Sequence, residues 1–245
     1  MRKQIPNLIT ICNLLCGTMA AYAAAIGHLD GAALLIMAGI VFDFFDGMAA
    51  RALGVSSAIG RELDSLADVV TSGVAPAVIA YQLFSAEHTL LGAVSLLTPA
   101  FSAYRLATFN LDTTQGTTFR GLPTPANALV WASLGLIYSR SELSSLSLLP
   151  TVPLINWLFS GAGVIVLAIL SVVLDLLMVS NVRMLNLKFH DLRWKSNRHR
   201  FLLIATSIAA IVLMGVPGIA VAILLYILLS IFTGQDSTTP ADHSR

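Results

Sequence analysis

Four aspartates stand close together in a strongly apolar chain: Asp43, Asp46, Asp64 and Asp68. A charged side chain inside a transmembrane segment costs about 2.5–3.5 kcal/mol and by default marks a function. Like charges at such short range cannot all ionise unless cations lie among them. Carboxylate oxygens are the ligands of hard ions, so the sequence predicts a site for Mg²⁺ or Mn²⁺ rather than for zinc.

The spacing of these aspartates places them on facing helices. Four residues share one face when successive positions are set 100° apart: Asp43, Asp46, Gly47 and Ala50. Asp64 and Asp68 share a face of the next predicted helix, and the connection between the two helices contains Gly54, which helps the chain to reverse. Two antiparallel helices would then bring the four carboxylates opposite one another.

The chemistry that this arrangement predicts is phosphoryl-type transfer. Two divalent cations about 3.5–4 Å apart would hold the attacking and leaving oxygens of an in-line displacement. Arg51 adds a planar cation suited to phosphate oxygens. In the alternative, the aspartates cap helices and pair with Arg51 and Arg61, which would explain one or two acids but not four.

The elements that carry these residues are transmembrane helices. Of 245 residues, 56% are hydrophobic and 11% are charged, against about 25% charged in typical globular proteins. A bilayer core of about 30 Å needs about 20 apolar residues per helix. Segments of suitable composition run over residues 8–26, 31–51, 64–84, 89–109, 123–139, 152–181, 201–215 and 217–232. The sequence therefore predicts an all-α, polytopic membrane helix bundle of about eight helices, the last two forming either a hairpin or one long broken helix.

The charge distribution predicts the orientation. With eight helices, every Lys and Arg except Arg140 falls on the side of the N-terminus, which the positive-inside rule makes cytoplasmic. We therefore expect the protein to lie in the inner (cytoplasmic) membrane of a cell, with the aspartates at the cytoplasmic face. A net charge of +1 and the lack of basic runs with interleaved aromatics give no indication of a nucleic-acid partner. Residues 1–232 are predicted to form one membrane domain, and residues 233–245 a disordered polar tail.

The aspartates belong to a longer pattern, D-x2-D-G-x2-A-R-x8-G-x3-D-x3-D. Its fixed positions are Asp43, Asp46, Gly47, Ala50, Arg51, Gly60, Asp64 and Asp68. This pattern resembles the signature of the CDP-alcohol phosphotransferases. The resemblance implies a six-helix core, here followed by a C-terminal hairpin, and a homodimer. It also implies that an alcohol hydroxyl attacks the β-phosphate of a CDP-linked donor, usually CDP-diacylglycerol, and expels CMP.

The same resemblance assigns roles to residues. It implies that Asp43, Asp46 and Asp64 bind metal, and that Asp68 is both a metal ligand and the proton acceptor. The residues that match nucleotide-lipid contacts of the family, or that are small signature residues beside them, are Asn7, Thr10, Gly47, Ala50, Arg51, Ser57 and Gly60.

Three further stretches, over residues 2–17, 63–77 and 105–126, resemble the bacterial and archaeal phosphatidylserine synthases of this family. The acceptor implied is L-serine. We expect Arg105 or Arg120 to bind its carboxylate, with Asn110 nearby, although both arginines could instead contact lipid phosphates or water at the membrane surface. Residues 71–73 either line the acceptor pocket or allow close helix packing. Asp175 has no partner that the sequence identifies.

Two rival functions make different predictions. Phosphatidylglycerophosphate and phosphatidylinositol-phosphate synthases take acceptors that carry phosphate, and would need extra basic residues near the third and fourth helices. Residues 69–104 contain no Lys or Arg, which favours serine. An ion transporter would typically show internal repeats and helices broken at mid-membrane, whereas this acidic cluster occurs once and at one membrane face.

Overall fold

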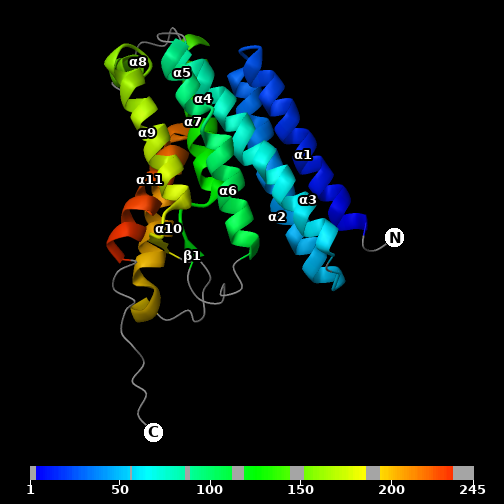
Figure 1. Ribbon diagram of the computed structural model, residues 1–245. Coiled ribbons are helices and arrows are strands. Elements are labelled where there is room, and N and C mark those ends of the chain that lie inside the picture. Colours follow the sequence, from blue (N-terminus) through cyan, green and yellow to red (C-terminus); the bar gives the residue numbers. More distant parts are fainter. Residues whose placement is uncertain are drawn as a thin grey trace.

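The computed structural model describes residues 4–55, 57–85, 89–111, 119–143, 152–185 and 194–233, and these form an all-α bundle (Figure 1). In chain order the elements are α1 (Gln4–Ala25), α2 (Leu29–Leu53), α3 (Ala58–Asp68), the π-helix η1 (Val69–Val74), α4 (Ala75–Ser85), α5 (Thr89–Ser95), α6 (Thr98–Leu111), β1 (Phe119–Arg120), α7 (Thr124–Leu143), α8 (Val152–Leu158), α9 (Ala162–Val179), β2 (Arg183–Met184), α10 (Trp194–Met214) and α11 (Val216–Thr233).

The predicted helix bundle is confirmed, with local differences. The third predicted segment is a continuous path through α3, η1 and α4, while the fourth and sixth are each broken by a turn into α5 and α6, and into α8 and α9. The C-terminal pair forms two helices, joined at Gly215 with φ of 65°, a conformation that glycine adopts without strain. Two-residue strands β1 and β2 pair antiparallel and were not predicted. The predicted tail beyond residue 233 lies outside the described residues.

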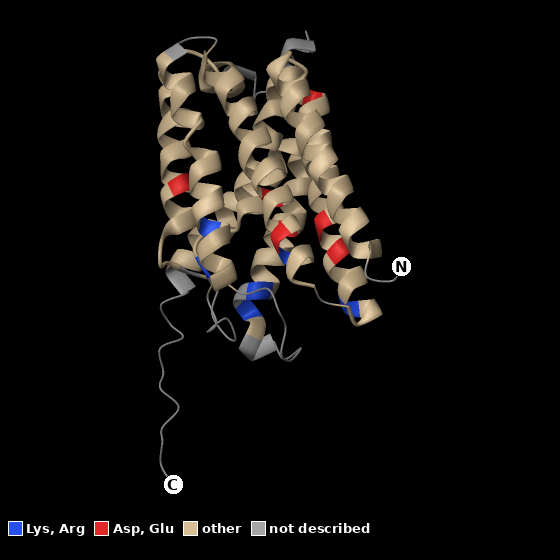
Figure 2. Cartoon of the chain, turned by 45° about the vertical axis from the view of Figure 1, so that its right-hand side comes forward, with Lys and Arg blue, Asp and Glu red and all other residues tan. Residues whose placement is uncertain are grey.

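Length and composition identify the chain as a multi-pass membrane protein. Within the described residues, five helical stretches are long and apolar enough to cross a membrane, and two shorter apolar helices lie near the C-terminus. Large hydrophobic side chains are exposed along these helices, as expected for surfaces that face lipid tails. Figure 2 shows the described basic side chains gathered toward one end of the bundle, while most of the described acidic ones lie nearer its middle.

Small residues bring the helices of the core together. Ala20 and Ala24 of α1 and Ala32 and Ala33 of α2 are fully buried, which allows the two backbones to pack closely along their length. The larger core side chains lie deeper in the bundle, where Trp131 of α7 packs edge-on against Phe84 of α4 with ring centroids 5.5 Å apart. α1, α2 and α3 form one side of the molecule, and α9, α10 and α11 the other (Figure 1).

The π-helix η1 follows Asp68 directly and packs between α1 and α6. Thr71 fills the space left by Gly17 of α1 and Gly39 of α2, since a Cβ on either glycine would collide with it. Gly73 packs closely against Ser102 of α6. Of the two alternatives for residues 71–73, the structure therefore supports close helix packing for Thr71 and Gly73. A π turn next to an aspartate of the signature is also a position where functional sites are frequent.

Candidate active site

The two facing helices bring three of the four aspartates together. Carboxylate oxygens of Asp43 on α2 and of Asp64 and Asp68 on α3 all lie within 4.8 Å of one another. Asp43 and Asp64 are close enough to share a hydrogen bond, and Asp64 Oδ1 is buried without a hydrogen-bond partner among the described residues. Three half-buried carboxylates with an unsatisfied oxygen fit a bound divalent cation, whose charge would offset their repulsion.

The fourth aspartate lies beside this group. Asp46 is 6% exposed and accepts a hydrogen bond of 2.6 Å from Thr10 Oγ1 of α1. It is near enough to interact electrostatically with the other three carboxylates. The structure thus places Asp46 at the edge of the group, facing α1, and its predicted role as a metal ligand stays a prediction.

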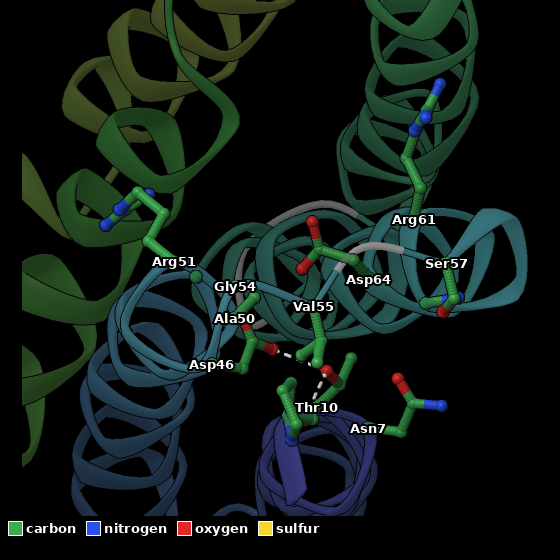
Figure 3. A pocket seen from close by; sticks show the side chains of 13 residues that line it. Asn7, Thr10, Asp46, Ala50, Arg51, Gly54, Val55, Ser57, Arg61 and Asp64 are labelled. Carbon is green, nitrogen blue, oxygen red and sulfur yellow. Dashed lines mark hydrogen bonds between the residues drawn. The ribbon is translucent and has the colours of Figure 1, made fainter. Parts of the chain in front are cut away.

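A pocket of about 490 Å³ opens among α1, α2 and the start of α3 (Figure 3). Its lining includes every predicted nucleotide-lipid contact: Asn7, Thr10, Gly47, Ala50, Arg51, Ser57 and Gly60. Asp46 and Asp64 also line it, so the pocket reaches the carboxylates. Figure 3 shows Arg51 and Arg61 on opposite sides of the pocket, with Thr10 and Asp46 between α1 and α2.

Local sequence explains how the chain turns around this pocket. α2 ends at Gly54, whose φ of 60° is left-handed, and the Gly54 N–H bonds back to the carbonyl of Arg51. α3 then begins with Ser57 as its N-cap, because Ser57 Oγ accepts from the Gly60 N–H at 3.0 Å. A Cβ on Gly60 would come within 2.8 Å of Ser57 Oγ and 3.0 Å of Asn7 Oδ1, so only glycine fits there without displacing them.

The two arginines of the pocket, Arg51 and Arg61, do not form ion pairs with the aspartates among the residues that the structure describes. The Arg51 guanidinium lies over Gly47, where a Cβ would be 3.5 Å from Nη1. Among the residues that the structure describes, neither Arg51 nor Arg61 makes an ion pair. The alternative of capping aspartates paired with these arginines therefore finds no support.

A second group of polar residues lies on the other side of Asp68. Arg105 of α6 is 8% exposed, interacts electrostatically with Asp68, and has its guanidinium 6.0 Å from the ring of Phe109. Asn110 donates a 2.8 Å hydrogen bond to Ser65 Oγ, which fixes the end of α6 against α3. The structure thus brings Arg105 and Asn110 to the site.

Arg120 lies elsewhere. It is exposed and belongs to strand β1, where it pairs in register with Arg183 of β2. No described contact joins it to the carboxylates. Of the two arginines predicted for the acceptor, only Arg105 is therefore next to Asp68 in this structure.

Sequence reasoning missed two neighbours of the site. Asn13 of α1 donates a hydrogen bond to Asp68 Oδ1 at 3.2 Å, and its position three residues after Thr10 on the same helix face was the available signal. Tyr226 of α11 interacts electrostatically with Arg105, but it is remote in sequence and no pattern pointed to it.

Asp175 is a second buried acid, besides Asp46, among the residues that the structure describes. It is 1% exposed on α9, and its Oδ2 accepts a 3.0 Å hydrogen bond from Thr98 Oγ1, while Oδ1 has no partner among the described residues. It does not line the pocket of Figure 3. Its partner is thus a neutral hydroxyl of α6.

The fold and the site define a polytopic membrane protein in which three clustered carboxylates, suited to hold a metal ion, lie beside a pocket. The sequence model of the CDP-alcohol phosphatidyltransferase family matches residues 3–169. The chain belongs to that family and is a membrane transferase of phospholipid biosynthesis, which removes the ion transporter as an alternative. Members use divalent metals, and the group of Asp43, Asp64 and Asp68 is suited to hold one.

Individual relatives extend the similarity beyond the signature. The chain is 31% identical over 229 residues to a CDP-diacylglycerol–serine O-phosphatidyltransferase of Helicobacter pylori (strain ATCC 700392 / 26695), covering 92% of this chain and 89% of the relative. It is 39% identical over 138 residues to the protein of the same name from Bacillus subtilis (strain 168), covering 56% and 78%. An archaetidylserine synthase of Methanothermobacter thermautotrophicus is 34% identical over 146 residues, covering 58% and 61%.

Proposed function

We propose that this protein is a phosphatidylserine synthase, which transfers the phosphatidyl group of CDP-diacylglycerol to the hydroxyl of L-serine and releases CMP. The observation that supports it best is the convergence of the predicted nucleotide-lipid contacts on one pocket that ends at the carboxylate group. The names of the relatives from Helicobacter pylori and Bacillus subtilis point to the same donor and acceptor.

The pocket suits the CDP part of the donor. It is wide enough for a nucleotide, and pockets of about 300–1,000 Å³ are typical of small-molecule sites. Asn7, Ser57 and Thr10 offer polar atoms for the cytidine and ribose, and Arg51 offers two N–H donors for phosphate oxygens. Gly47 and Gly60 have no side chains that would fill the space beside those groups.

The reaction is a displacement at the β-phosphorus. The serine hydroxyl oxygen forms the new bond to phosphorus, the bond from phosphorus to the oxygen that bridges to CMP breaks, and CMP leaves with that electron pair. In this proposal Asp68 accepts the hydroxyl proton as the bond forms, since the pKa of a free alcohol lies far above 7. Asp43, Asp46, Asp64 and Asp68 would hold Mg²⁺ or Mn²⁺, which when bound neutralises phosphate charge and acidifies a coordinated hydroxyl.

Arg105 is the residue that we propose binds the carboxylate of the acceptor. Arg105 is 8% exposed and interacts electrostatically with Asp68, the residue that would receive the hydroxyl proton. A buried arginine is a strong partner for a carboxylate, which serine carries on the carbon next to its hydroxymethyl group. Arg120 and Asn110 would play smaller parts, because the first is exposed and the second is already bonded to Ser65.

The setting that we propose follows the charge distribution. The end of the bundle that carries the described basic residues would face the cytoplasm, in the inner membrane of a cell, so that water-soluble serine and CMP have direct access. Residues 1–232 would form one membrane domain and residues 233–245 a tail. A homodimer is the assembly that the family resemblance implies.

An acceptor comparison tests the proposal. Purified protein in nanodiscs receives CDP-diacylglycerol and Mn²⁺ with L-serine, glycerol 3-phosphate, inositol phosphate or no acceptor, and CMP and the lipid product are measured by mass spectrometry. We expect CMP and phosphatidylserine in stoichiometric amounts with serine alone.

L-alanine is the matched control, because it keeps the ammonium and carboxylate of serine and lacks only the hydroxyl. It should release no CMP and should inhibit the reaction competitively with serine. Release of CMP with glycerol 3-phosphate but not with serine would overturn the choice of acceptor. If no alcohol caused release of CMP, the proposal that the protein catalyses this transfer would be wrong.

A further inference from the structure

Asn13 connects α1 to Asp68. Its side chain is fully buried, and Nδ2 donates to Asp68 Oδ1 at 3.2 Å. One turn earlier on the same helix, Thr10 donates to Asp46. Two successive polar residues on one face of α1 therefore each bind one aspartate of the site, although only the Thr10 position belongs to the wall of the nucleotide pocket.

The orientation of the Asn13 amide is determined by Asp68. A half-turn of the amide would place its oxygen against a carboxylate oxygen, and two acceptors repel each other. With Nδ2 toward Asp68, the amide Oδ1 points toward Gly39 of α2, where a Cβ would be only 2.9 Å away. That oxygen is buried and has no hydrogen-bond partner among the described residues.

An unpaired buried acceptor lowers stability, so Asn13 is not the side chain that packing alone would favour. An apolar side chain of similar shape would avoid that cost. Residues that cost stability at a polar site are typically there for function. The contact with Asp68 is the one described interaction of the Asn13 side chain that compensates for it.

The backbone of Asn13 is fixed as well. Its carbonyl accepts a 3.0 Å hydrogen bond from Thr71 Oγ1, and Thr71 lies in the π-helix that directly follows Asp68. Thr71 can approach because Gly17 and Gly39 leave room for it. The segment that carries Asp68 and the segment that carries Asn13 are thus tied to each other by two bonds, one through backbone and one through side chain.

We propose that Asn13 is a positioning residue for Asp68. By binding Oδ1, the amide stops rotation of the carboxylate and leaves the second oxygen free to receive the proton of the acceptor hydroxyl. The inference rests on the proposed function in one respect, the role of Asp68 as the base. It does not depend on which alcohol is the acceptor.

The test replaces Asn13 by leucine, which keeps the branched shape and removes the donor. We expect kcat to fall about 100-fold, a loss typical of a misplaced catalytic group. The KM for serine and the affinity for CDP-diacylglycerol should stay unchanged, because Asn13 does not line the pocket. The Tm should change little, because loss of the unpaired Oδ1 offsets loss of the hydrogen bond to Asp68.

Two further variants make the result decisive. Asn13→Ala removes the same donor with a smaller side chain, so it reports on kcat if leucine prevents folding. Thr18→Ala is the matched control, since Thr18 is an exposed polar residue of the same helix that bonds only to the Leu14 carbonyl. Its kcat should equal that of the wild type.

Wild-type kcat in a folded Asn13 variant would overturn the inference. So would a fall in kcat accompanied by equal losses of Tm and CDP-diacylglycerol affinity, since that pattern indicates packing. The rates are compared with whichever alcohol supports CMP release by the wild type. Failure of serine as acceptor therefore contradicts the proposed function, while the comparison of Asn13 with Thr18 still decides the role of the amide.

Discussion

The cluster of Asp43, Asp64 and Asp68 has two sides, and these are built in different ways. The proposed nucleotide side is a pocket whose described lining lies between residues 6 and 64, on α1, α2 and the start of α3. The proposed acceptor side is assembled from segments far apart in the chain, since Arg105 of α6 interacts electrostatically with Asp68 of α3 and Tyr226 of α11. The first side is rich in glycine and small polar residues, and the second depends on one buried cation.

This difference suggests that one side recognises the donor and the other selects the acceptor. A pocket made by one continuous stretch can recognise the part of the donor that all CDP-linked lipids share. An acceptor site formed where distant helices meet can change with a few substitutions and leave the chemistry intact. We therefore expect substitutions on the two sides to separate into effects on the donor and effects on the acceptor, with Asp68 between them affecting the chemical step.

Replacing Asp68 by Asn should have the largest effect. The change keeps the size of the side chain and removes the base, so kcat should fall by about 10³-fold, within the usual range for general-base catalysis. Binding of CDP-diacylglycerol, measured by isothermal titration, should remain. Substantial activity in this variant would show that another group accepts the proton. Asp68 would then no longer be the catalytic residue between the donor side and the acceptor side.

Replacing Asp64 by Ala should weaken the metal site. Asp64 contributes to the group of three carboxylates and has the unpaired Oδ1. We expect Mn²⁺ affinity, followed by electron paramagnetic resonance, to fall by about 100-fold or more, because even outer partners of metal ligands are worth 10–100-fold. Glu62→Ala, an acid of the same helix outside the group, is the control and should bind Mn²⁺ as the wild type does.

Replacing Arg105 by Ala should affect the acceptor alone. Loss of one partner of a buried charge pair costs about 2–5 kcal/mol, so the KM for serine should rise by about 100-fold while the KM for CDP-diacylglycerol is unchanged. Arg120→Ala is the comparison variant and should change the serine KM much less, because Arg120 is exposed in β1. Equal effects of the two substitutions would contradict the placement of the acceptor beside Arg105.

Replacing Gly60 by Ala should give the smallest effect, on the donor side. The new Cβ would come within 2.8 Å of Ser57 Oγ and 3.0 Å of Asn7 Oδ1, two pocket residues that must then move. Overpacking of this kind costs about 1–3 kcal/mol, so the KM for CDP-diacylglycerol should rise about tenfold. Gly31→Ala, where a Cβ meets nothing within 4 Å, is the control. A rise in the serine KM instead would place Gly60 on the acceptor side.

The amino-acid sequence by itself determined the helix bundle and the helix faces that carry the aspartates. Hydrophobic runs long enough to cross a bilayer have few alternatives to helices, because lipid offers no partners for unpaired backbone groups. The spacing of Asp43, Asp64 and Asp68 fixed their helix faces, since residues three or four apart on a helix are neighbours. The pocket residues, from Asn7 to Gly60, came instead from the resemblance to the family, and the structure brings them to one pocket.

Only the tertiary structure decided which distant residues complete the site. Arg105 and Arg120 looked equivalent in the sequence, yet packing of α6 against η1 brings the first to Asp68, and the pairing of β1 with β2 keeps the second at the surface. Tyr226 of α11, which interacts electrostatically with Arg105, was likewise beyond any local sequence pattern. The physical reason is that helix faces follow from local periodicity, whereas contacts between helices depend on how small residues such as Gly17, Gly39 and Gly73 let their backbones approach.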